Sequence, residues 1–199
     1  PSTHLQNMLV EVPEIDELLH YSGVPDRDTL AQTFQEIRKT GQAVSLEIWA
    51  QEYNRLFEGN VLCPINESGF VRRDKGAILA DIAGFYKAFG FQLAVNTGEK
   101  LDHLICELEF VVLLLIMLAK AREENLTEGY SVTYDALAAF CHDHLGEWLA
   151  LFCQQLTQMT VLPVYQQIAK LIQSAWSGVM TVNQLPMAEG SLPAMAIEE

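Results

Sequence analysis

Acidic and imidazole side chains that could do chemistry gather in one short stretch, from Asp102 to Glu107. His103 and Glu107 are four residues apart, a spacing that places them on one helix face as a candidate pair of metal ligands. Two ligands do not make a site, because helical two-metal proteins repeat a Glu-x-x-His pair on further helices. No such repeat occurs in this sequence. We therefore interpret Glu107 as a half-buried partner of a neighbouring hydrogen-bond donor, and we expect no metal centre.

A second group of this kind is Cys141-His142-Asp143-His144. Adjacent His and Asp on a helix are how HD-type phosphohydrolases hold a divalent metal ion, and His103 is the candidate upstream ligand. The downstream aspartate that such a site needs is missing, because Asp143 is the last aspartate of the chain. A metal-dependent phosphohydrolase stays as an alternative function. The simpler interpretation is that His142 and Asp143 face solvent while His144 packs at a helix end.

Motifs for phosphate binding and nucleophilic catalysis are absent from the sequence. It contains neither a G-x-x-x-x-G-K-[ST] phosphate loop nor a G-x-S-x-G nucleophile elbow. Cys141 and His142 are neighbours, but adjacent residues point to different helix faces, and burial without a nearby base raises the pKa of a thiol. We therefore expect no catalytic residue.

The four cysteines also argue against a metal site or a disulfide framework. They form no C-x-x-C pair, and two of them lie within apolar helical patterns, where free cysteine behaves as a small hydrophobic residue. The sequence therefore predicts buried, reduced thiols at Cys63, Cys106, Cys141 and Cys153.

Composition and charge exclude several classes of partner. The chain of 199 residues is 50% hydrophobic and carries a formal charge of −14. Such a charge repels nucleic acid and anionic membrane surfaces but attracts basic peptides. The acidity is concentrated after Arg122, where the sequence contains nine acidic residues and one basic residue, Lys170. The first eight residues lack the basic and apolar runs of a secretory signal, so we expect a cytoplasmic protein.

The apolar run from Phe110 to Ala119 predicts the central helix that must position these groups. Its apolar residues occur on all sides, so other helices or lipid must surround it. The run covers about half of the roughly 20 residues needed to cross a bilayer, which favours a buried core helix and argues against membrane insertion. Asp102 is the expected N-cap of this helix, with His103 exposed beside it.

The remaining pattern is also helical, so the predicted fold class is all-α. We expect residues 1–180 to form a single globular helical bundle around the central helix, and residues 181–199 to form a flexible tail. Helix starts are expected at the proline or capping residue of each apolar pattern, and a break is expected at Gly146. The expected starts are Pro13, for a short helix ending at Gly23, and Asp26 or Asp28, Ser45, Asp74, Thr133 and Pro163.

Five stretches between Ser45 and Trp176 carry a further signal through their order and spacing. They are Glu52-Tyr53-Asn54-Arg55-Leu56-Phe57, Cys63-Pro64-Ile65-Asn66-Glu67-Ser68, Asp102-His103-Leu104 with Glu107-Leu108-Glu109-Phe110, His144-Leu145-Gly146-Glu147-Trp148, and Tyr165-Gln166-Gln167-Ile168-Ala169-Lys170-Leu171. Taken together, they resemble the TorD/DmsD/NarJ-type cytoplasmic chaperones, the redox enzyme maturation proteins that assist molybdoenzymes.

This resemblance implies a non-enzymatic role. Its clients would be the twin-arginine signal peptide, or the apo-form, of the catalytic subunit of a molybdopterin oxidoreductase. Binding would assist cofactor insertion and hold back export. The implied peptide-binding residues are those at the mouth and loop edge of an apolar groove, with Tyr53 and Phe57 holding the scaffold. They are Asp102, His103, Glu67, Ser68, Pro64 and Glu107. The resemblance also allows weak guanine nucleotide binding, and either a monomer or a helix-swapped dimer.

The charge of the chain agrees with this implication independently of the resemblance. A twin-arginine peptide has a basic front and an apolar middle, and an acidic protein with an apolar groove between helices suits both. A general helical interaction module without a signal-peptide role is the third hypothesis, beside the chaperone and the phosphohydrolase.

Overall fold

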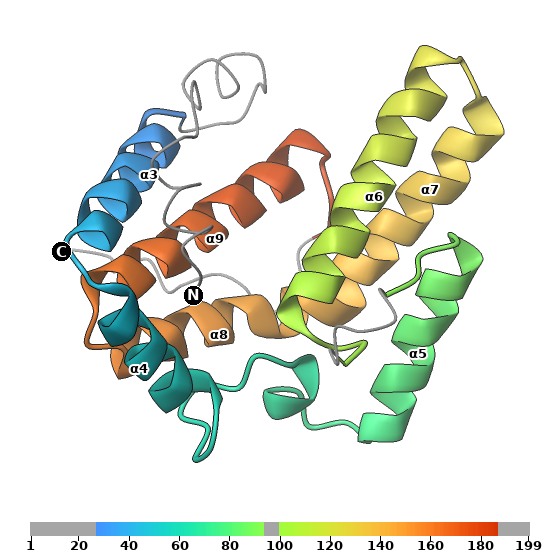
Figure 1. Ribbon diagram of the computed structural model, residues 1–199. Helices are drawn as coiled ribbons and strands as arrows, with labels where there is room; N and C mark the ends of the chain where they lie inside the picture. Colours follow the sequence, from blue (N-terminus) through green and yellow to red (C-terminus); the bar gives the residue numbers. More distant parts are fainter. Residues whose placement is uncertain (1–26, 94–99, 187–199) are drawn as a thin grey trace, which may run out of the picture. The chain divides into compact units, whose positions relative to one another are not determined.

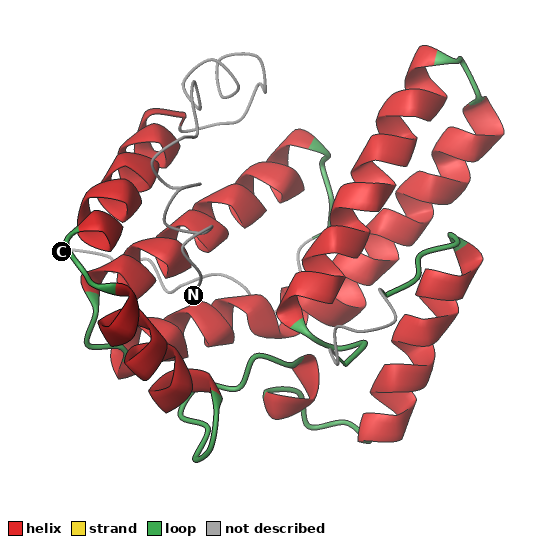
Figure 2. Cartoon of the chain, viewed as in Figure 1, coloured by secondary structure: helices red, strands yellow, loops and turns green. Residues whose placement is uncertain are grey.

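The computed structural model describes residues 27–93 and 100–186, and within these two ranges it contains helices joined by loops and no strand (Figures 1 and 2). The all-α fold class is therefore confirmed. The helices are α3 (Arg27–Gln42), α4 (Leu46–Phe57), the 3-10 turn η1 (Glu67–Gly69), α5 (Lys75–Ala88), α6 (Leu104–Glu123), α7 (Thr127–Phe140), the π-helical turn η2 (Cys141–Leu145), α8 (Gly146–Met159) and α9 (Pro163–Val182). None of these described helices is both long enough and apolar enough to cross a bilayer.

The described chain divides into two compact units. The first unit comprises residues 27–64 and 150–185, and the second comprises residues 65–93, 100–149 and 186. The single domain over residues 1–180 stays a prediction. Helix α9 runs to Val182, and Leu185 is buried, so ordered structure continues past the expected boundary at residue 180. The helix expected from Pro13 to Gly23 and the tail from residue 187 onward lie outside the described residues.

In the first unit, α3 packs along α9 (Figure 1), and the Trp49 ring of α4 meets the Tyr165 ring of α9 at 5.8 Å. The buried carboxylate of Glu52 ties α4 to the loop before α9. It accepts hydrogen bonds at 2.8 Å from both the Thr160 hydroxyl and the Val161 amide. The hydrogen bond from Arg55 lowers the pKa of Glu52, against the opposing effect of burial. This unit is therefore held by apolar packing and one ionised, well-satisfied carboxylate.

Two of the expected capping residues are confirmed by hydrogen bonds, and Pro163 starts α9 as expected. Ser45 Oγ accepts from the Ile48 amide at 3.4 Å, and Asp74 Oδ1 accepts from the Ala77 amide at 2.9 Å. The cap expected at Thr133 is wrong. Helix α7 begins six residues earlier, after a tight turn from α6, and the Thr133 hydroxyl donates to the Gly129 carbonyl inside the helix.

The core of the second unit is a cluster of rings around Phe110 of α6, whose side chain is fully buried. Its ring centroid lies 4.7 Å from that of Phe140 on α7 and 4.9 Å from that of Tyr86 on α5. In Figure 1, α6 and α7 run side by side. Aromatic pairs at these separations add stability beyond the apolar area that they bury. Helix α6 is thus a packed core element of this unit, as expected.

The expectation that α6 is surrounded on all sides is wrong. Ile105, Val112 and Ile116 are 50%, 53% and 60% exposed, and they recur at helical spacing on one side of α6. The opposite side is buried along Cys106, Phe110, Leu114 and Leu118. The sequence pattern could not distinguish the two sides, because both carry large apolar residues. The second unit therefore presents an exposed apolar face on α6, defined by Ile105, Val112 and Ile116.

The expected break at Gly146 is also wrong. The chain stays helical through Gly146, and the irregularity precedes it as the π-helical turn η2. Such turns often occur at functional sites, because they re-aim side chains within an otherwise continuous helix. Here η2 carries the buried residue His144.

The cysteines are free and buried, as predicted. Burial raises the pKa values of Cys63, Cys141 and Cys153 to about 12. These thiols therefore stay protonated and chemically inert at neutral pH.

Candidate functional site

The loop after Cys63 is fastened to the start of α6 by a short antiparallel bridge between Asn66 and His103. The Glu67 amide donates to the Asp102 carbonyl at 2.9 Å, and the Leu104 amide donates to the Ile65 carbonyl at 3.0 Å. Segments almost 40 residues apart in the sequence thus meet through backbone hydrogen bonds. This bridge brings four of the predicted site residues together: Glu67, Ser68, Asp102 and His103.

Asp102 is not the N-cap of α6, which corrects the sequence-based prediction. Its fully buried carboxylate accepts instead from the Ser68 amide at 3.2 Å and from Asn66 Nδ2 at 3.3 Å. The N-cap is His103, whose Nδ1 accepts from the Ile105 amide at 3.2 Å. A buried carboxylate needs hydrogen-bond donors on its oxygens, and the bridged loop supplies them to Asp102. Its side chain is therefore not available to cap α6, and the next residue, His103, is the N-cap. His103 is 8% exposed, so its expected exposure is also wrong.

Replacing Asp102 by Asn should therefore destabilise the protein through the loop and leave the helix cap intact. The amide retains only one acceptor oxygen. Its NH2 group would face either the Ser68 amide, which is a donor, or the Asn66 amide, which would have to turn over to present its own oxygen. We expect a loss of about 1–3 kcal/mol, the usual cost of a buried polar group without a partner. Urea denaturation of the two proteins measures it. A loss within a few tenths of a kcal/mol would contradict this account of Asp102.

Glu67 lies at the centre of a buried ionic network in the second unit. Its side chain is fully buried, and its Oε1 accepts from Arg73 Nη2 at 2.8 Å. Its Oε2 lies 2.8 Å from Nδ1 of His144, which is also fully buried. Arg73 continues outward, donating to the Asp143 carbonyl at 2.7 Å and approaching Glu147 Oε2 at 3.4 Å. The network joins the loop 65–73 to η2 and the start of α8.

Glu107, one turn into α6, is a carboxyl group held in its neutral form. Its Oε2 accepts from Trp148 Nε1 at 3.2 Å, while its Oε1 is buried without a hydrogen-bond partner. Burial, with smaller contributions from the nearby charges of Glu67 and Asp102, raises the pKa of Glu107 to about 9, although the hydrogen bond from Trp148 opposes the shift. The prediction that Glu107 partners a neighbouring donor is confirmed, but the residue is fully buried and not half-buried.

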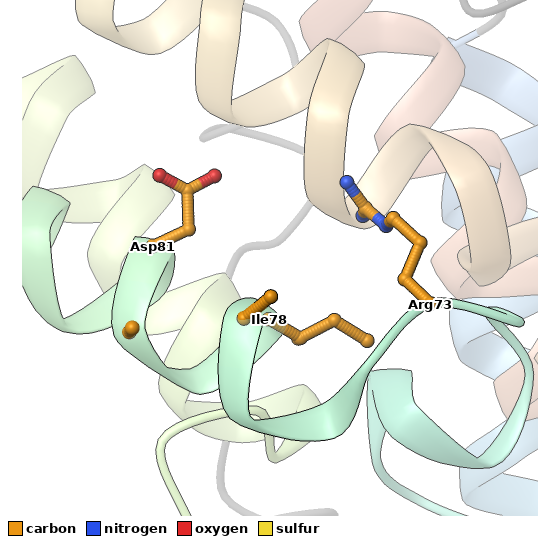
Figure 3. A pocket seen from close by; sticks show the side chains of 5 residues that line it. Arg73, Ile78 and Asp81 are labelled. Atoms are coloured by element: carbon orange, nitrogen blue, oxygen red, sulfur yellow. The ribbon is translucent and has the colours of Figure 1, made fainter.

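The outer end of the network opens into a pocket of about 470 Å³ beside α5. The pocket is lined by Arg73, Ala77, Ile78, Ala80 and Asp81. Figure 3 shows the Arg73 guanidinium and the Asp81 carboxylate extending to the same side of α5, with Ile78 between them. Asp81 is 60% exposed, and its Oδ2 lies 3.4 Å from His144 Nε2. The pocket is thus an open, charged recess next to a buried imidazole.

Pro64, His142 and Asp143 contribute no side chain to this network, although the Asp143 carbonyl accepts from Arg73. Pro64 is half-buried and belongs to the first unit. His142 and Asp143 are half-exposed and pair with each other, with 2.7 Å between His142 Nδ1 and Asp143 Oδ1, as the solvent-facing interpretation predicts. Within residues 27–93 and 100–186, no group of three or more His, Cys, Asp or Glu side chains has an arrangement that could hold a metal ion.

Sequence reasoning missed Arg73 and Asp81 altogether, and it gave no role to Trp148. Arg73 follows Arg72 as an adjacent basic pair in an acidic chain, a signal of a buried carboxylate partner that could have been used. Trp148 and His144 could have been predicted as site residues, because both belong to one of the five stretches that carried the family resemblance. Asp81 gave no signal, since an exposed aspartate on a helix is ordinary.

The protein-family comparison covers every residue of this network. The model of the family described as "Nitrate reductase delta subunit" matches residues 24–154. The chain belongs to the nitrate reductase delta subunit family. The expected family is thereby confirmed, and with it a role in molybdoenzyme maturation, since nitrate reductase delta proteins are maturation chaperones. No match was found among curated proteins or among solved structures.

Proposed function

We propose that this protein binds the twin-arginine signal peptide of a molybdopterin oxidoreductase subunit in the cytoplasm, without catalysing a reaction. By holding the peptide, or the apo-form of the subunit, it delays export until the molybdenum cofactor has been inserted. The supporting observation is the exposed apolar face of α6 on a chain of charge −14. An apolar helix face suits the apolar middle of such a peptide, and the acidic charge suits its basic front.

The bridge between the loop 65–68 and the start of α6 has a supporting role in this proposal. Glu67, Asp102 and Glu107 are fully buried, so in the described conformation they shape the site from beneath. Ser68 is half-buried and Ile105 is half-exposed, and both adjoin the bridge. We propose that the peptide lies over this region, with Ser68 and His103 nearest to it. Contact of the peptide with Pro64, Asp102, Glu67 or Glu107 stays a prediction.

The affinity for the signal peptide should fall as salt is added, but only in part. Salt screens the attraction between the acidic chain and the two arginines, whereas burial of the apolar segment is insensitive to moderate salt. We expect the dissociation constant to rise by about tenfold between low salt and 0.5 M salt, and then to level off. Titration calorimetry with a synthetic signal peptide measures this.

A peptide with both arginines replaced by glutamine is the matched control. Its affinity should start lower and change little with salt, because only the apolar contribution remains. Absence of binding by the arginine peptide at any salt concentration would remove the proposed function. If the affinities of both peptides depended equally on salt, the proposed attraction between the acidic chain and the two arginines would be contradicted.

A further inference from the structure

The exposed apolar face of α6 carries one charged residue on each side of an apolar pair. Along the helix the order is Glu109, Val112, Ile116 and Lys120, and all four side chains are exposed. Glu109 and Lys120 are eleven residues apart, which is three turns of an α-helix to within about 20°. The two charges therefore lie on the same flank of the face, about 16 Å apart, with the apolar pair between them.

This order of charges is complementary to its own reverse. When a second α6 lies antiparallel against the first, and the twofold axis passes halfway between Glu109 and Lys120, each Glu109 faces the Lys120 of the other copy. The same axis places Val112 almost opposite Ile116 of the other copy. Residues on one flank meet on the same side of an antiparallel pair, whereas a parallel pair would place them on opposite sides. One arrangement therefore matches the charges and the apolar residues together.

The charges on this face favour a second copy over an acidic or a basic partner. Glu109 and Lys120 cancel within the face, although the whole chain has a charge of −14. Salt at about 0.15 M screens the repulsion between two such chains beyond about 8 Å. Lys120 Nζ lies 3.9 Å from Glu124 Oε1, but both side chains are exposed, and such a pair one helical turn apart is weak. Lys120 can therefore pair with a second copy.

We propose that two copies of this protein pair through the exposed apolar face of α6, antiparallel and without exchange of helices. Val112 and Ile116 of both chains form the apolar centre, and two Glu109–Lys120 pairs fix the register. One pair of helices makes a small interface, so the association is weak and reversible. The next step rests on the proposed function: the signal peptide uses the same face, so the second copy covers the peptide site until a client displaces it.

Sedimentation velocity at increasing protein concentration tests the pairing in the absence of peptide. We expect the wild-type protein to shift from monomer to dimer, and Val112→Glu to stay monomeric, because this variant places two carboxylates in the apolar centre. Val112 is 53% exposed, so the variant should keep the fold, which circular dichroism checks. A wild-type protein that stays monomeric up to about 0.2 mM would overturn the proposal and leave signal-peptide binding intact.

Exchanging the two charges tests the antiparallel register. Glu109→Lys brings two pairs of ammonium groups together, and Lys120→Glu brings two pairs of carboxylates together, so each variant should self-associate about tenfold more weakly. A mixture of these two variants should associate more tightly than either alone, because unlike charges then meet at both ends. The double variant Glu109→Lys/Lys120→Glu should regain wild-type association. Equal association of all these proteins would overturn the proposed register.

A synthetic signal peptide tests whether the second copy covers the peptide site. Its addition to the dimer should yield monomers with bound peptide, measured by sedimentation of a fluorescently labelled peptide. Peptide bound to an intact dimer would overturn the covering role. A dimer that binds no peptide would remove the proposed function and the covering role together, while the pairing of two copies would stand.

Discussion

Replacing Glu67 by Ala should destabilise the protein by about 3–5 kcal/mol, since removal of one partner from a buried ionic network leaves the others uncompensated. The fully buried imidazole of His144 would lose the acceptor at its Nδ1, 2.8 Å away. Arg73 would also lose a carboxylate at 2.8 Å, although its 40% exposure lets water replace part of that contact. Chemical denaturation of both proteins, monitored by tryptophan fluorescence and by circular dichroism, measures the effect.

The matched control for this prediction is Glu109→Ala, which removes an exposed carboxylate from α6 of the same unit. It should change the free energy of unfolding by no more than about 0.5 kcal/mol. Glu67→Gln should lose an amount of stability between those of Glu67→Ala and Glu109→Ala, because the amide oxygen keeps one acceptor. A loss below 1 kcal/mol for Glu67→Ala would mean that the network contributes little to stability.

The second large effect is a pH dependence that arises from Glu107. Its pKa is raised to about 9 in the folded protein from a model-compound value of 4.5, mainly by burial. Between these values the folded state keeps a proton that the unfolded state has released. The contribution of Glu107 to stability is therefore fully present below pH 4.5 and is lost as the pH rises toward 9. The slope is about 1.4 kcal/mol per pH unit.

Glu107→Gln should abolish this part of the pH dependence. The amide oxygen still accepts from Trp148 Nε1, and the NH2 group takes the place of a hydroxyl at the partnerless Oε1 position. The variant should equal the wild type in stability near pH 4.5 and exceed it by about 2–3 kcal/mol at pH 7. Other titrating groups act in both proteins and cancel in the difference. A difference that stays constant from pH 5 to pH 8 would show that Glu107 is ionised in the folded state.

Local signals explain which helix boundaries could be predicted from the sequence. Ser45 and Asp74 cap their helices within three residues of themselves, and Pro163 fixes a helix start by its own ring, so these positions need no tertiary information. Thr133 shows the limit of this reasoning. A threonine at a cap and a threonine bonded to the preceding turn look alike in sequence, and only the early start of α7 separates them.

The candidate site depended on contacts between distant parts of the chain. The Asp102 carboxylate found its donors in the loop at Asn66 and Ser68, 34 to 36 residues away, and this displaced it from the predicted cap. His144 and Glu67 are 77 residues apart, and Trp148 and Glu107 are 41 residues apart. No local pattern encodes such pairs. The family resemblance located the stretches in which they occur, but it did not indicate which side chains meet.

The π-helical turn η2 has a consequence for the phase of the helix that contains it. Buried residues recur there in pairs every four positions, as Phe140 with Cys141, His144 with Leu145, and Trp148 with Leu149. In an α-helix, four residues turn through about 400°, so such pairs would drift round the axis by about 40° at each repeat. A wider turn at η2 offsets this drift and keeps His144 and Trp148 directed at Glu67 and Glu107. Pairs of buried residues that recur every four positions are thus the sequence pattern that corresponds to this π-helical turn.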